Sequence, residues 1–295
     1  MGDNPLIKLD ELTKPATVLV EKISEAIGGM FKPWQIVRVA KAEAAADRIR
    51  AESNIQITDL QQRAMRRFLV EEGKKQANIE EITTKALPLL SEESKPQDVS
   101  DDWITNFFDK CRIVSDSEMQ QLWSRILAGE ANNPGRFSRQ TVNLLSNLER
   151  GQAELFENLC GFGWKYGGYS PVLFPLVCDV RDAVYSERGI FYGGLLDLES
   201  LGLVKVDLYK GFTLRNQPER VTAAYFGTAI ELTLSSNQRE YFGVGQAVLT
   251  QAGQELAQVC APKRVEGLLE YAIKHWNEEK MMPRTSEQGP RPSSS

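Results

Sequence analysis

The chain has 295 residues, of which 42% are hydrophobic and 25% charged, and its formal net charge at pH 7 is −5. This length and composition are typical of a soluble globular protein with one large domain or two ordinary ones. The acidic balance argues against a dominant nucleic-acid surface, because a duplex binder needs clustered Lys and Arg. No window offers roughly 18 uncharged apolar residues, and the first residues lack the layout of a signal peptide. We therefore expect a cytoplasmic protein without a transmembrane segment.

Residues 1–90 are expected to form a helical N-terminal region. An apolar stripe at helical spacing between Leu12 and Met30 predicts an amphipathic helix. Acids and bases balance on its polar side, which favours ordinary packing over a membrane surface, although peripheral membrane contact stays open. Residues 37–52 are rich in Ala, Glu, Arg and Lys and predict a long solvated helix. Two further helices are expected over residues 58–73 and 78–87.

Residues 91–150 are expected to form a helical hairpin region. Ser115-x-x-Glu118 matches a capping box at the start of one helix, which should end near Gly129. An Asn-Asn-Pro-Gly turn follows, and Ser138 is placed to cap the second helix. The caps, the helix end and the turn residues of this hairpin all predict the same structure, as expected of a segment whose sequence specifies one packing arrangement.

Aromatic and basic side chains of the hairpin region raise the question of nucleic-acid binding. The aromatic residues lie beside Leu and Ile on apolar helical faces, which favours core packing over base stacking; they are Trp103, Phe107, Phe108 and Trp123. Arg136 and Arg139 flank the turn before the second helix and could contact phosphate. A solvated basic turn is the simpler interpretation, and these two arginines are the candidate nucleic-acid-binding residues.

The pattern of residue types changes over residues 151–276 and predicts a smaller α+β domain. Strands are expected over residues 203–207, 220–226 and 229–234, followed by helices near residues 254–259 and 265–276. Residues 277–295 lose apolar periodicity and are expected to be a disordered tail.

Two segments of this domain resemble a winged helix. LLDLESLGLVKVD, residues 195–207, predicts a helix that leads into a strand, and AVLTQAGQELAQV, residues 247–259, predicts a strand followed by a Thr-capped helix. The helix that would enter a DNA groove is acidic, so repulsion by phosphate opposes docking there. We expect a winged-helix-like packing or interaction module rather than a DNA reader.

Signatures of catalysis are missing from the sequence. There is no GxxxxGK[ST], GxGxxG or GxSxG motif. The four cysteines are scattered without a CxxC pair, and His275 is the single histidine. We assign no catalytic residue, metal ligand or cofactor, and expect the cysteines to be buried free thiols.

Several stretches resemble a bacterial family of uncharacterised proteins, the domain-of-unknown-function family number 2806. They read LTKPATVLVEKISEAIGGMFKPWQI, RRFLVEEGKKQANIEEITTKALP, DDWITNFFDKCR and SDSEMQQLWSRILAGEANNPGRFSRQTVNLL. The resemblance brings no activity or catalytic residue. It implies a cytoplasmic protein of the accessory genome, a group that often serves phage defence or stress responses, which is an associational argument.

The fold expected is mainly α, with a helical N-terminal region followed by a smaller winged-helix-like α+β domain. The leading hypothesis is a non-catalytic bacterial interaction protein, a sensor or effector component of antiviral defence, with a protein partner or self-association. Two alternatives stay open. One is a winged-helix nucleic-acid-binding regulator, and the other is a carboxylate- or metal-dependent hydrolase or nuclease, since Asp and Glu are plentiful.

Overall fold

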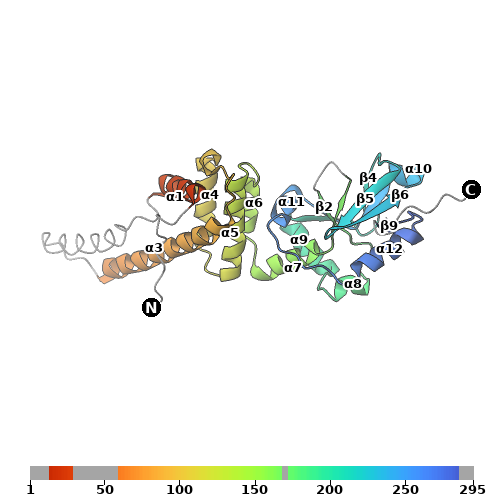
Figure 1. Cartoon of the computed structure of the whole chain (residues 1–295). Helices are drawn as coiled ribbons and strands as arrows, with labels where there is room; N and C mark the ends of the chain where they lie inside the picture. Colours follow the sequence, from red (N-terminus) through yellow and green to blue (C-terminus); the bar gives the residue numbers. More distant parts are fainter. Residues whose placement is uncertain (1–12, 29–58, 168–171, 286–295) are drawn as a thin grey trace, which may run out of the picture. The chain divides into compact units, whose positions relative to one another are not determined.

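The structure is a computed structural model that describes residues 13–28, 59–167 and 172–285. It divides the chain into two compact units, residues 1–146 (unit 1) and residues 147–295 (unit 2) (Figure 1). Unit 1 is helical and unit 2 is mixed α/β, which confirms the expected order of the two parts. The helix predicted over residues 37–52 lies outside the described residues.

Unit 1 is a helical assembly around an aromatic core. Its elements are α1 (Lys14–Ile27), α3 (Asp59–Ala86), the short 3-10 helices η2 (Leu87–Leu89) and η3 (Pro96–Asp98), α4 (Asp101–Cys111), α5 (Ser117–Asn132) and α6 (Arg139–Leu145). The ring of Phe107 stacks on Trp103 with 5.0 Å between centroids and meets Trp123 edge-on at 5.1 Å. Phe108 is buried with them, so the prediction that these four aromatic residues form core is confirmed.

The apolar stripe of α1 is used for packing within unit 1. Ala16, Leu19, Val20 and Ile23 are buried, and Lys22 on the polar side forms an ion pair with Asp101 at the start of α4 (3.0 Å). The apolar side chains that a lipid-binding helix would insert into a membrane are therefore buried in the core of unit 1. This is the ordinary packing that the balanced charges of the helix favoured.

The two helices expected over residues 58–73 and 78–87 are a single helix, α3. Gly73 lies in its interior, where glycine costs roughly 1 kcal/mol relative to alanine. Packing outweighs this cost: Ile79 and Ile82 are buried, and the Asn78 carboxamide donates to the carbonyl of Arg112 (2.9 Å). Tertiary contacts thus decide the continuity of α3.

The first helix of the hairpin region, α5, begins and ends at residues other than those expected. Asp116, rather than Ser115, caps α5, because its carboxylate accepts the backbone N–H groups of the next turn. The helix also continues past Gly129 to Asn132. Gly129 is needed for close packing instead, since a Cβ atom there would lie 2.7 Å from the ring of Phe137.

The turn between α5 and α6 is held by a buried carboxylate. The two oxygens of Glu130 accept the N–H groups of Gly135 (2.6 Å) and Phe137 (2.8 Å), while the indole of Trp103 donates to the Phe137 carbonyl (2.7 Å). Ser138 then caps α6 by accepting the N–H of Thr141 (3.2 Å), as predicted. The carboxylate of Glu130 thus satisfies two backbone N–H groups of the turn.

The described residues of unit 2 form short helices and three antiparallel sheets. The helices are α7 (Arg150–Cys160), α8 (Ala183–Ser186), α9 (Tyr192–Ser200), α10 (Ser236–Glu240), α11 (Gln251–Ala257) and α12 (Leu268–Glu278). The strands are β1 (Gly163–Tyr166), β2 (Leu173–Pro175), β3 (Val204–Val206), β4 (Phe212–Leu214), β5 (Arg220–Tyr225), β6 (Thr228–Thr233), β7 (Phe242–Gly245), β8 (Ala247–Leu249) and β9 (Arg284–Thr285). The largest sheet has the order β2-β1-β5-β6-β9, and β3-β8 and β4-β7 form two-stranded sheets.

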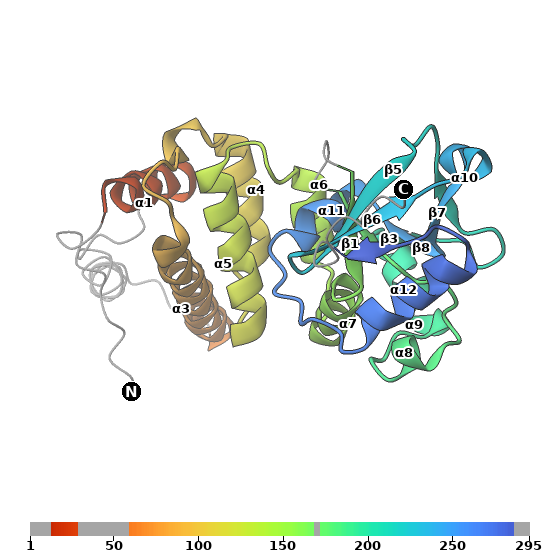
Figure 2. The same ribbon diagram turned by 45° about the vertical axis from the view of Figure 1, so that its right-hand side comes forward.

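The core of unit 2 lies between the largest sheet and α12. Trp164 on β1 stacks on Tyr225 of β5 with centroids 4.8 Å apart and meets Trp276 of α12 edge-on at 4.9 Å. All three side chains are buried. Helix α12 therefore covers one face of the sheet (Figure 2).

The two segments that resemble a winged helix lie together. Strand β3 pairs with β8, with Val204 opposite Leu249, and the hydroxyl of Thr250 at the start of α11 donates to the carbonyl of Gly202 (2.6 Å). The chain between them forms β4, the β5–β6 hairpin, α10 and β7, which is much more than a wing. The mixed α/β character is established, whereas the winged-helix likeness stays a prediction.

The expectation of a disordered tail from residue 277 is wrong for its first part. Helix α12 continues to Glu278, Met281 is buried, and β9 pairs with β6 through Ile230 and Thr285. Burial of Met281 and pairing with the edge strand β6 order this segment. Neither interaction leaves a periodic pattern in the local sequence. Residues 286–295 lie outside the described part of the chain.

Candidate functional site

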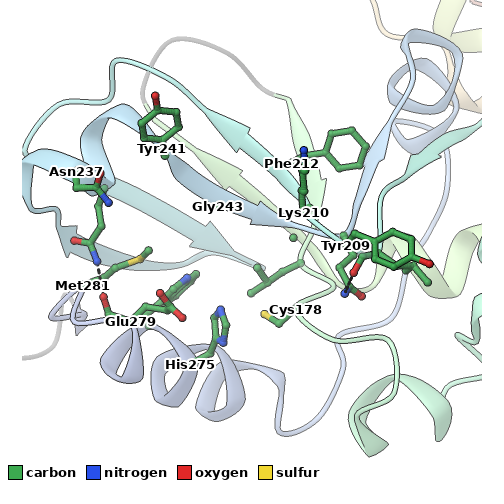
Figure 3. A pocket seen from close by; sticks show the side chains of 17 residues that line it. Cys178, Tyr209, Lys210, Phe212, Asn237, Tyr241, Gly243, His275, Glu279 and Met281 are labelled. Atoms are coloured by element: carbon green, nitrogen blue, oxygen red, sulfur yellow. Dashed lines mark hydrogen bonds between the residues drawn. The ribbon is translucent and has the colours of Figure 1, made fainter.

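Unit 2 contains a cavity of about 360 Å³, which we call the α12 cavity. Strand β7 forms one wall, and the last turns of α12 form the wall beneath it (Figure 3). The remaining wall comes from the loop before β4 and from α10. Its lining includes both apolar and polar groups; the polar and aromatic side chains are Cys178, Tyr209, Lys210, Phe212, Asn237, Gln238, Tyr241, Gln246, His275, Trp276 and Glu279.

The β7 wall is shaped by glycines and a bulge. The β4–β7 register shifts between Phe212 and Thr213, and such a bulge bends the strand and redirects its side chains. Gly245 has φ +105°, and a Cβ there would lie 2.9 Å from the backbone of Val177. At Gly243, by contrast, a Cβ would meet no heavy atom within 4 Å. The missing side chain of Gly243 therefore leaves room in the cavity.

Some of the polar residues around the α12 cavity serve the fold. The Gln246 carboxamide accepts the N–H of Val180 (3.0 Å) and donates to the carbonyl of Leu208 (3.1 Å). Gln238 completes the capping box of α10 and donates to the Glu279 carbonyl. These two amides hold the walls of the cavity in place, and most of their hydrogen-bonding capacity is already used.

Other polar groups keep their hydrogen-bonding capacity. The imidazole of His275 is half-buried and points into the cavity (Figure 3), and it forms no hydrogen bond with the described residues. The Asn237 carboxamide and the Lys210 ammonium likewise have no hydrogen-bond partner among the side chains that the structure describes. The ring of Tyr209 is 99% exposed and that of Tyr241 is 49% exposed. The cavity thus offers a cation, an imidazole, an amide and two aromatic rings.

The thiol of Cys178 borders the cavity but is not activated. Burial raises its pKa to about 11, although hydrogen bonds with Tyr185 and Tyr271 act in the opposite direction. The hydroxyl of Tyr185 accepts a hydrogen bond from the N–H of Cys178 (3.0 Å) and donates one to the Leu176 carbonyl (2.9 Å), so this buried tyrosine anchors the segment that carries the thiol. A thiol that stays protonated at neutral pH is a poor nucleophile.

A second candidate feature is the first half of α3, residues 59–71, which we call the projecting half. It extends away from α4 and α5 (Figure 1), and all of its residues except Leu69 are exposed, including Met65 at 45% and Phe68 at 60% exposure. Phe68 lies three turns before Ile79, so the stripe that is buried in the second half of α3 continues here as an exposed one.

The two predicted nucleic-acid-binding residues lie at the α5–α6 turn. The guanidinium of Arg136 is 5.5 Å from the ring centroid of Phe137, and the side chain is half-buried. Arg139 is the first residue of α6 and is exposed. Nothing in this arrangement tests phosphate binding, which stays a prediction.

Sequence motifs pointed to neither the α12 cavity nor the projecting half. The residues that line the α12 cavity come from four stretches of chain, brought together only by the fold of unit 2; they are residues 176–178, 208–212, 237–246 and 275–281. One local signal was present: Phe-Gly-Val-Gly at residues 242–245, because glycines inside a strand often mark a bulge or the close approach of a ligand. Within the ranges that the structure describes, no three His, Cys, Asp or Glu side chains gather closely enough to hold a metal ion. None of the described helices has both the length and the apolar run that a membrane crossing requires.

A helical unit followed by a mixed α/β unit with antiparallel sheets defines the class of this protein. The profile of a family described as a protein of unknown function (DUF2806) matches residues 62–272. The chain belongs to this family, as the sequence resemblance predicted. Comparison with curated proteins and with solved structures gave no match.

Proposed function

We propose that this protein is a non-catalytic cytoplasmic interaction protein that acts as a sensor or effector component of antiviral defence. The observation that carries the interaction is the exposed apolar stripe on the projecting half of α3. The defence setting rests on the family's resemblance to accessory-genome proteins, which is an argument by association.

The projecting half has the composition of a docking surface. Leu60, at 67% exposure, and Met65 lie toward the side of the helix that carries Phe68, whereas Val70, at 54% exposure, faces the other way because it is only two residues from Phe68. Large apolar side chains that gather on one exposed element mark interaction sites more often than scattered ones do. Aromatic side chains such as Phe68 are also frequent anchors of protein interfaces.

Charge indicates the kind of partner. Arg63, Arg66 and Arg67 lie on the same thirteen residues, while Asp59 and Glu71 are the acids. Glu71 is already engaged with Arg67, at 3.5 Å along the helix. At about 3.6 residues per turn, these arginines lie beside or opposite Phe68 on the helix rather than around it. A helix with an apolar side and a basic side fits a protein surface that offers an apolar patch next to carboxylates.

Phage challenge tests this proposal. Cells that express the wild-type chain and cells that lack it are infected with a phage panel at low and high multiplicity. We expect protection by the wild type and its loss in Phe68→Glu, because a carboxylate in the anchor position opposes docking. Gln62→Glu adds a similar charge to the same exposed helix outside the stripe and is expected to protect. The proposal fails if the wild type protects against no phage, or if Phe68→Glu, expressed at an equal level, protects as well.

A further inference from the structure

We propose that the α12 cavity of unit 2 binds a planar heteroaromatic anion of the nucleoside monophosphate type. This site is separate from the projecting half of α3, and its evidence is independent of the defence proposal. Its volume of about 360 Å³ falls within the range of roughly 300–1,000 Å³ that small-molecule sites occupy.

The planar part of the ligand is inferred from the exposed rings. Tyr241 and Tyr209 border the cavity with much of their surface in solvent, and the Arg215 guanidinium lies 5.7 Å from the centroid of Tyr241. Nucleobases stack readily on tyrosine rings and on guanidinium planes, because every base offers a flat π-face. Tyrosine rings left in solvent at a cavity rim gain contacts when such a ring binds.

The anionic part is inferred from the charges. Among the described residues that line the cavity, Lys210 is the one lysine or arginine and Glu279 the one carboxylate, and His275 can add a proton or accept a hydrogen bond. Lys210 and Glu279 lie at separate places on the wall (Figure 3). A phosphate is expected beside Lys210, and N–H groups of a base are expected beside Glu279 and the Asn237 carboxamide.

Space for the ligand is provided at Gly243. This residue faces open space, whereas the neighbouring Gly245 approaches the Val177 backbone too closely for any side chain. A leucine at position 243 can therefore enter the cavity without disturbing the walls. Gly193 in α9 offers a matched control, because it is exposed and a Cβ there also meets no heavy atom within 4 Å.

Calorimetric titration of the full chain tests the inference, with AMP, GMP, CMP and UMP as probes and the four nucleosides in parallel. We expect at least one monophosphate to bind, Gly243→Leu to weaken it by about tenfold or more, and Gly193→Leu to bind normally. Lys210→Gln should weaken the monophosphate while leaving the nucleoside unaffected. Phe68→Glu should bind as the wild type does, which separates this site from the defence proposal.

Three results would overturn the inference. The first is that none of the four monophosphates binds into the millimolar range. The second is that Gly243→Leu, shown to be folded by circular dichroism, binds with unchanged affinity. The third is that nucleosides and monophosphates bind equally and Lys210→Gln changes neither affinity, which would remove the anionic part of the assignment.

Discussion

At the scale of single residues, some polar side chains hold turns and loops in place through hydrogen bonds that the local sequence does not predict. Glu130 accepts two backbone N–H groups of the α5–α6 turn, and Gln246 joins two loops beside the cavity. Glutamate is seldom fully buried unless it is paired. Nothing in the local sequence distinguishes Glu130 from an ordinary surface acid in a helix, so its position could only be found in the fold.

Replacing Glu130 should destabilise unit 1. In Glu130→Ala the N–H groups of Gly135 and Phe137 lose their acceptors. Gly135 is exposed, so water can replace its acceptor, whereas the N–H of buried Phe137 is left unsatisfied at a cost of roughly 1–3 kcal/mol. We expect the free energy of unfolding, measured by urea denaturation, to fall by about 1–3 kcal/mol. Gln121→Ala, at an exposed position of the same helix, should change it by less than about 0.5 kcal/mol. Equal stabilities of the two variants would contradict this role of Glu130.

The buried thiol of Cys178 should make stability depend on alkaline pH. Its pKa rises from an ordinary value of 9.0 to about 11 in the folded protein, because burial disfavours the thiolate. The unfolded chain therefore loses this proton first, and the contribution to stability, present below about pH 9, is lost as the pH rises toward 11. Between these pH values the wild type should lose up to about 2 kcal/mol more than Cys178→Ala does, in urea titrations at each pH. Parallel pH profiles of the two proteins would show that the thiol ionises freely.

At the scale of elements, local signals predicted helices and strands well where they agreed with packing. The caps Ser138 and Thr250 begin α6 and α11, and the strands over residues 220–226 and 229–234 are the β5–β6 hairpin. Errors arose where a contact distant in sequence overruled a local signal. Gly73 does not interrupt α3, and Gly129 does not end α5, because each helix continues along a surface that buries its apolar stripe.

The segment after α12 offers a prediction at this scale. Thr233 donates its N–H to the Met281 carbonyl (2.9 Å), and β9 extends the largest sheet beyond β6. A chain that ends at residue 279 should therefore have a lower melting temperature, by about 3–8 °C if one to two kcal/mol are lost. A chain that ends at residue 285 keeps all of these contacts and should melt as the full chain does. Identical melting of both truncated chains would show that β9 adds no stability.

At the scale of the whole molecule, two units each carry their own aromatic core. Trp103, Phe107 and Trp123 form the core of unit 1, and Trp164 and Trp276 lie at the centre of unit 2. The change in composition near residue 150 lies close to the boundary between the units, and the family was predicted from motifs between residues 12 and 145. The α12 cavity and the projecting half belong to different units, so the two proposals can be tested separately.

The sequence by itself determined the helical first part, the mixed second part, the family and the capping residues of α6 and α11. These properties follow from periodicity, composition and side chains that bond to backbone groups a few residues away. Only the tertiary structure decided the continuity of α3, the order of residues 277–285 and the assembly of the α12 cavity. Those features depend on groups that are far apart along the chain, such as Cys178, Gly243 and His275, and no local pattern encodes which distant segments will meet.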